Sequence, residues 1–173
     1  MPETALITRT PEAEPYIAHY RERYDPPARR NVPAHVTILY PFMAPTQVTA
    51  GVLERLRGVA RAVPCFDYRM ARTQRFRVAL YLAPDPDTSF SALIDGVVRE
   101  FPDYPPFEGK FDTVVPHITV AHGDEPLLCE LEVALRIALP GAGVAARCTE
   151  LVLIENSSGR WEQMEVFPLG APK

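Results

Sequence analysis

One four-residue pattern occurs twice in this chain, and it constrains both the fold and the chemistry. It reads HVTI at residues 35–38 and HITV at residues 117–120, that is, a histidine and a threonine, each followed by a β-branched apolar residue. Successive side chains of a strand point to opposite faces, so the imidazole and the hydroxyl share one face and the apolar residues share the other. The sequence therefore predicts two strands, each buried on one side and carrying a His–Thr pair on the other.

A His–Thr pair on an open strand face suits phosphodiester chemistry. Imidazole, with an ordinary pKa of about 6.5, takes up or releases a proton near neutral pH, and a hydroxyl can hold an anionic oxygen. Two such pairs facing each other would supply the base and the acid of a phosphodiester reaction. Because the pattern is symmetric, it does not say which histidine is the base. The candidate catalytic residues are His35, Thr37, His117 and Thr119.

The alternative for both segments is a pair of ordinary strands whose histidines lie at the edge of the core. The order of the surrounding elements argues against it, because helix, His–Thr strand, helix and strand pair follow one another in each half of the chain. After an opening strand at 5–8, the elements of the first half are expected at 10–24, 34–40, 47–62, 66–72 and 76–82. Those of the second half are expected at 90–101, 114–121, 124–139, 148–154 and 161–167.

This repeated order predicts an α+β fold made of two pseudo-symmetric lobes. Each lobe would be an antiparallel sheet with helices on its outer face, and an active-site cleft would lie between the sheets. We expect one bilobal domain over residues 1–173, with half-repeats of about 1–82 and 83–173. The symmetry would bring the two His–Thr pairs together.

The net charge and the cysteine content limit the kinds of substrate and the cellular location that we expect. A net charge of -4 argues against a broad basic surface for long duplex nucleic acid and leaves a nucleotide or an RNA end as the better substrate. Cys65, Cys129 and Cys148 fit no zinc spacing and are typical of reduced thiols in a cytoplasmic protein. Since the chain has neither an apolar run of membrane-spanning length nor a signal segment, we expect it to be cytoplasmic and to have no membrane partner.

With its doubled motif and repeated order of elements, the chain resembles the two-histidine (2H) phosphoesterase superfamily, most closely the bacterial 2′-5′ RNA ligase and cyclic phosphodiesterase branch. The resemblance covers essentially the whole chain. It implies a phosphodiesterase that hydrolyses 2′,3′-cyclic phosphates or 2′-5′-linked nucleotides and RNA ends, with reversible 2′-5′ ligation. One histidine would take a proton from water, the other would give one to the leaving ribose oxygen, and the threonines would hold the non-bridging oxygens.

The same resemblance implies that neither a metal ion nor a cofactor takes part, and we expect a monomer. The alternative from a different class is a non-catalytic module that binds a nucleotide or an RNA end in the same cleft. The two intact His–Thr pairs favour the enzyme, because a binding module has no need of two proton carriers.

Four further residues are candidates for substrate binding. In the RNA ligase branch, the fifth residue after each motif histidine tends to line the cleft, with an aromatic after the first and an arginine after the second. Tyr40 keeps the aromatic character, whereas His122 departs from the arginine and would bind phosphate more weakly. Strict alternation would place both on the packing face, so this assignment requires each strand to twist or end there.

Alternation along residues 76–82 predicts that Arg77 and Tyr81 face a ligand, while Phe76 and Val78 pack against a helix. The alternative for Arg77 and Tyr81 is an ordinary solvated sheet face. Trp161 could provide a surface on which a base stacks, although a single tryptophan in a hairpin more often serves packing.

Overall fold

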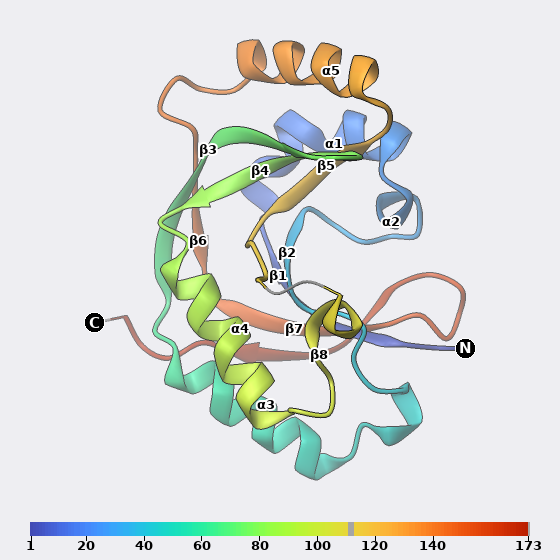
Figure 1. The fold of residues 1–173 in the computed structure, drawn as a ribbon. Coiled ribbons are helices and arrows are strands. Elements are labelled where there is room, and N and C mark those ends of the chain that lie inside the picture. Colours follow the sequence, from blue (N-terminus) through green and yellow to red (C-terminus); the bar gives the residue numbers. More distant parts are fainter. Residues whose placement is uncertain (111–112, 173) are drawn as a thin grey trace.

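The computed structural model describes residues 1–110 and 113–172, and it contains two four-stranded antiparallel sheets with helices packed on them (Figure 1). The first sheet has the order β2-β1-β7-β8, with β1 at Thr4–Arg9, β2 at His35–Leu39, β7 at Glu150–Glu155 and β8 at Glu162–Pro168. The second has the order β5-β4-β3-β6, with β3 at Phe66–Phe76, β4 at Ala79–Asp85, β5 at Ile118–His122 and β6 at Val144–Cys148. The predicted α+β fold with two sheet-bearing lobes is confirmed.

The helices divide between the two sheets. Helices α3 (Ala50–Ala62) and α4 (Thr88–Glu100) pack on the first sheet, and α1 (Glu14–Tyr24) and α5 (Glu125–Ala138) pack on the second. A short helix, α2 at Pro26–Arg29, lies in a segment expected to be a loop. None of the helices in the described part of the chain is long and apolar enough to cross a membrane.

Local sequence signals explain where the helices begin and which face they bury. The Thr49 hydroxyl caps α3 by accepting from the Val52 amide, and Asp124 caps α5 in the same way through Leu127. Apolar residues at helical spacing form one buried stripe along α4, namely Phe90, Leu93, Ile94 and Val97.

Each half of the chain gives strands to both sheets. Strand β3 and most of β4 belong to the first half but pair with β6 and β5 of the second, while β7 and β8 of the second half extend the first sheet from β1. The helices are exchanged between the halves as well: α1 of the first half packs on β5 of the second, and α4 of the second half packs on β2 of the first. The expected boundary near residue 82 therefore does not separate the two sheets, and neither half holds a complete sheet by itself.

Two strand boundaries differ from those expected. Residues 76–82 do not form one strand, because Phe76 pairs with Ala79 across a two-residue turn at 77–78. Residues 148–154 also divide: Cys148 ends β6 in the second sheet, and β7 begins at Glu150 in the first. The intervening residue carries the chain from one sheet to the other.

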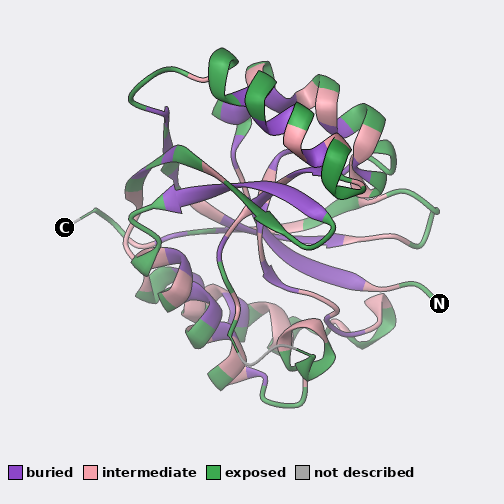
Figure 2. Ribbon diagram, turned by 45° about the horizontal axis from the view of Figure 1, so that its top comes forward, coloured by how far each residue is buried: buried purple, intermediate pink, exposed green. Residues whose placement is uncertain are grey.

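The apolar residues of both motifs are buried, which fixes the face on which the His–Thr pairs lie. Val36, Ile38, Ile118 and Val120 are each at most 1% exposed and belong to the main core, which extends between the sheets and the helices packed on them. Figure 2 shows buried residues along the strands and on the helix sides that face them. A smaller apolar cluster, made of Ala5, Ile7, Val32, Val152 and Ile154, lies beside Tyr40 and Trp161.

We expect Phe90→Ala to lower the free energy of unfolding by about 3–5 kcal/mol, because it removes a large side chain from a closed core. Phe90 is 0% exposed, and its ring centroid lies 4.9 Å from those of both Phe66 and Tyr68. Urea unfolding would measure the change, with Asp95→Ala on the exposed side of α4 as the control. A loss below about 1 kcal/mol for Phe90→Ala would contradict this description of the core.

Candidate active site

The two His–Thr strands lie next to each other in space (Figure 1). Strands β2 and β5 are the edge strands of their sheets, and their Cα atoms approach to within 8 Å. His35 begins β2 and His117 immediately precedes β5, and the charge of His117 makes a minor contribution to the lowered pKa of His35. The fold thus brings together residues that are far apart in the sequence.

Both imidazoles are held in the same way. Nδ1 of His35 lies 2.7 Å from the Pro33 carbonyl oxygen, and Nδ1 of His117 lies 2.6 Å from the Val115 carbonyl oxygen. A carbonyl oxygen only accepts, so Nδ1 carries the proton in each ring and donates it to this bond. Each Nε2 is therefore the nitrogen left for chemistry, as an acceptor when the ring is neutral and a donor when it is charged.

Burial biases both histidines toward the neutral form. It lowers the pKa of His35 to about 4, helped by the positive charge of Arg21 and opposed by the bond to Pro33 and by Asp25. Burial also lowers the pKa of His117, and the charge of the nearby His122 lowers it further. The two rings thus differ in environment although their backbone bonds match.

A buried ion pair lies next to the site. It is formed by two residues that the sequence analysis did not identify as candidates. Arg21 and Asp25 are 2% and 1% exposed, and the guanidinium donates from Nε and Nη2 to Asp25 Oδ2 over 3.1 and 2.9 Å. The second carboxylate oxygen, Oδ1, lies 3.4 Å from Nδ1 of His122. His122 thus lies near Asp25 at the end of α1 without a hydrogen bond to Oδ1 in the described part of the chain, and its side chain is 44% exposed.

Each motif strand contains a bulge that changes the direction of its fifth residue. In β2, Ile7 pairs with Thr37 and Leu6 with Leu39, which leaves the intervening residue as an extra one. Two consecutive side chains, Ile38 and Leu39, are consequently buried, and Tyr40 returns to the face of the His–Thr pair.

Strand β5 repeats the arrangement. Tyr81 pairs with Thr119 and Leu80 with Ala121, so that Val120 is the extra residue and both it and Ala121 are fully buried. His122 then comes back to the side of His117. The bulges supply the departure from strict alternation that Tyr40 and His122 require.

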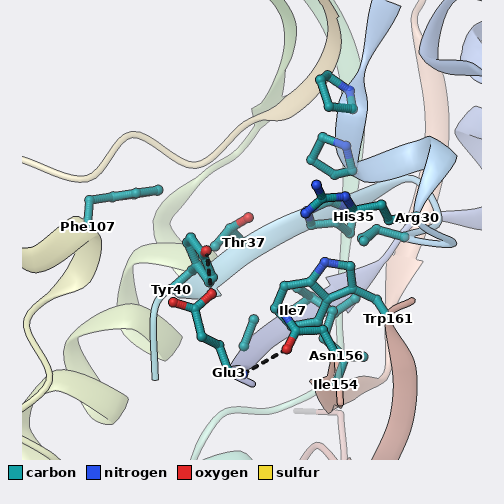
Figure 3. Close-up of a pocket in the computed structure, with 14 residues that line it drawn as sticks. Glu3, Ile7, Arg30, His35, Thr37, Tyr40, Phe107, Ile154, Asn156 and Trp161 are labelled. Carbon is teal, nitrogen blue, oxygen red and sulfur yellow. Dashed lines mark hydrogen bonds between the residues drawn. The ribbon is translucent and has the colours of Figure 1, made fainter. Parts of the chain in front are cut away.

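A cavity of about 330 Å³ opens beside the first motif (Figure 3). Of the sequence candidates, it is lined by His35, Thr37, Tyr40 and Trp161. It is also lined by residues that carry no site signal in the sequence, chiefly Glu3, Arg30, Phe107 and Asn156. Within residues 1–110 and 113–172, the guanidinium of Arg30 has no hydrogen-bond or ion-pair partner.

Tyr40 and Glu3 form a polar pair in this cavity. The Tyr40 hydroxyl donates to Oε2 of Glu3 over 2.8 Å, and the ring meets Trp161 edge-on at 6.0 Å between centroids. Burial, together with Glu3, raises the pKa of Tyr40 to about 12. The hydroxyl thus keeps its proton at neutral pH and remains a donor.

The second motif has aromatic neighbours of its own. The ring of Tyr81 lies 5.2 Å from that of His117, as expected for a residue on the ligand face. Phe76 stacks on Tyr81 at 4.3 Å and meets His117 edge-on at 5.1 Å, so its expected place on the packing face is wrong. Val78 is also not packed but 57% exposed, because the turn at 77–78 ends the strand.

Arg77 lies in that turn rather than on the ligand-facing side of a strand, as alternation predicts. It lines a second cavity, of about 600 Å³, together with Tyr81, Arg75 and Glu125. The structure therefore gathers Tyr40 with the first histidine and Tyr81 with the second. Arg77 belongs to the outer part of the second lobe.

Comparison with known proteins gives a family and a fold. The model of the 2′-5′ RNA ligase superfamily matches residues 9–160. The crystal structure of E. coli LigT complexed with 3′-AMP is 18% identical, with a TM-score of 0.64 over 98% of this chain and 99% of that one. LigT complexed with NADP+ is 18% identical, with a TM-score of 0.60 over 97% of both chains.

The protein TT0787 of Thermus thermophilus is 15% identical, with a TM-score of 0.61 over 99% of this chain and 100% of that one. At such identities the likeness to these structures concerns the fold alone. No curated protein sequence matches the chain.

We expect NMR titration to show His35 titrating near pH 4 and His117 below its ordinary value of 6.5. The folded state then binds fewer protons than the unfolded chain between these pH values, so the free energy of unfolding falls as pH is lowered from 6.5 toward 4. His35→Gln should weaken this dependence. Titration of His35 at 6.5 or above would contradict the effect of burial.

Proposed function

The chain belongs to the 2′-5′ RNA ligase superfamily, and on this basis we propose that it is a phosphodiesterase acting on 2′,3′-cyclic phosphates or 2′-5′ linkages of nucleotides and RNA ends. The catalytic residues in this proposal are His35, Thr37, His117 and Thr119. The observation that carries it is the presence of two imidazoles on neighbouring strands, each with Nδ1 bound to a carbonyl and Nε2 without a partner in the described part of the chain. This arrangement suits proton transfer on two sides of one phosphate.

In hydrolysis of a cyclic phosphate, His35 is the base and His117 the acid. The pKa of His35 is lowered to about 4, so its Nε2 is the better placed to be unprotonated and to accept a proton from water. The water oxygen bonds to phosphorus as the bond from phosphorus to one ribose oxygen breaks. Nε2 of His117 gives its proton to that leaving oxygen, and exchange with solvent restores both rings.

The hydroxyls of Thr37 and Thr119 donate to the non-bridging oxygens, whose charge shifts during the reaction. Arg30 is unpaired among the described residues and lies beside His35 in the cavity, where it supplies a positive charge for the phosphate. It thereby takes over the part of the arginine that the RNA ligase branch has at the position of His122. Tyr40 offers a ring face to a base, and Arg77 meets a longer substrate at the outer cavity. Tyr81 is buried and stacked on Phe76, so its part in this proposal is to position the ring of His117, against which it packs.

Run in reverse, with a 5′-hydroxyl in place of water, the same groups join two ends as a 2′-5′ linkage. The two proton transfers call for neither a metal ion nor a cofactor, and we expect the enzyme to act as a monomer. The three cysteines are free, which supports a location in the reducing cytoplasm.

We expect His35→Ala and His117→Ala each to lower kcat on 2′,3′-cyclic nucleotides by about 10²- to 10⁴-fold, because each removes one proton carrier. Turnover would be followed by chromatography of the product monophosphates, and circular dichroism would confirm that the fold survives. His19→Ala is the matched control, since this histidine is exposed on α1 and contacts Tyr20.

Wild-type activity should persist in EDTA. Activity retained in both histidine variants, or lost on chelation, would contradict the proposed mechanism. If cyclic nucleotides stabilise the protein against heat and none is hydrolysed, the chain is a binding module instead.

A further inference from the structure

The cavity beside His35 has the shape and lining of a site for a planar ring. Its volume of about 330 Å³ lies at the lower end of the range for small-molecule sites. Ala5, Ile7 and Ile154 form an apolar floor on the face of the first sheet that also carries His35 and Thr37. Aromatic side chains border it, with Trp161 and Phe107 on opposite sides of the cavity in Figure 3. A phosphate held at His35 would bring its own nucleoside into this space.

One wall of the cavity is polar and has a fixed arrangement. Oε2 of Glu3 accepts from the Tyr40 hydroxyl, and the amide of Glu3 donates to Oδ1 of Asn156 over 2.8 Å, as Figure 3 shows. Asn156 in turn donates from its own backbone amide to the Glu3 carbonyl oxygen over 3.2 Å. These bonds tie the residue before β1 to the residue after β7.

The two side chains retain unused hydrogen-bonding groups. Among the described residues, Oε1 of Glu3 has no partner, and Oε2 can accept a second bond besides that from Tyr40. The oxygen of the Asn156 amide is fixed by the Glu3 amide, so Nδ2 is left to donate. The wall therefore presents a carboxylate that only accepts, next to an amide group that donates.

We propose that Glu3 and Asn156 read the edge of the base and select guanine, an inference that rests on the proposed function. Guanine carries two adjacent donors, N1–H and N2–H, and beside them the acceptor O6. Its donors would bind the two oxygens of Glu3, and O6 would accept from Nδ2 of Asn156. Adenine and cytosine each offer a single donor group on this edge, and uracil offers one imino donor between two carbonyls that would face the carboxylate. When one of these other bases binds, at least one oxygen of the half-buried Glu3 carboxylate loses water and gains no donor from the base. Adenine, cytosine and uracil therefore bind less tightly than guanine.

Binding and turnover together test this inference. Calorimetry would measure the affinities of the 3′-monophosphates of guanosine, adenosine, cytidine and uridine for the full chain, and kcat/KM would be compared across the corresponding 2′,3′-cyclic nucleotides. We expect guanosine to bind about tenfold more tightly than adenosine, the discrimination typical of a bidentate contact to a base.

Glu3→Gln should remove most of that preference, because glutamine presents one acceptor and one donor, which matches adenine better. Asn156→Asp should also weaken guanosine binding by placing an acceptor opposite O6. Glu22→Gln, on the exposed side of α1, is the matched control and should keep the wild-type order.

Equal affinity for the four bases, or a guanine preference that survives Glu3→Gln, would overturn the inference. A guanine preference in binding without turnover of any cyclic nucleotide would overturn the proposed function and leave this base site standing.

Discussion

Burial of the β-branched residues of β2 and β5 sets the direction of the side chains in the candidate site. With Val36 and Ile38 in the core, His35 and Thr37 have to face outward, and the same holds for the second motif. Because both strands lie at sheet edges and next to each other, the two His–Thr pairs lie in the same region of the molecule. Each sheet pairs strands of the first half with strands of the second, so the position of each histidine depends on both halves of the chain.

Desolvation of the imidazoles themselves sets the electrostatics of the site. It lowers the pKa of both histidines, and the positive charge of Arg21 adds to this effect at His35. Arg21 and Asp25 are themselves nearly inaccessible, which makes their mutual hydrogen bonds necessary, because an unpaired buried charge is strongly destabilising. Arg30, whose side chain has no partner among the described residues, lies in the cavity beside the first motif.

Local patterns are sufficient to predict the motif strands and the helices expected at 90–101 and 124–139, because each depends on residues a few positions apart. The bulges in β2 and β5 were not predictable, since they depend on the register with β1 and β4. The turn at 77–78 has the sequence Arg-Val and lacks the glycine or asparagine that usually marks such turns. Alternation therefore continues through it in the sequence pattern and predicts the wrong face for Phe76.

Arg21 and Asp25 have the i, i+4 spacing of an ordinary surface pair on a helix, and only the packing shows that they are buried. Glu3 and Asn156 are 153 positions apart, and no local pattern links them. The sequence was therefore most informative where function depends on strand parity. It was silent where the site is assembled from the two ends of the chain.

The proposed mechanism requires two histidines with lowered pKa values to work as a base and an acid on one phosphate. The pH dependence of kcat/KM on a 2′,3′-cyclic nucleotide examines this requirement in a single experiment, because this parameter reports the ionisations of the free enzyme. We expect a bell-shaped profile with its maximum below pH 6.5, between a limb for His35 near 4 and a limb for His117. A rate that rises steadily to alkaline pH, with no descending limb, would contradict the mechanism.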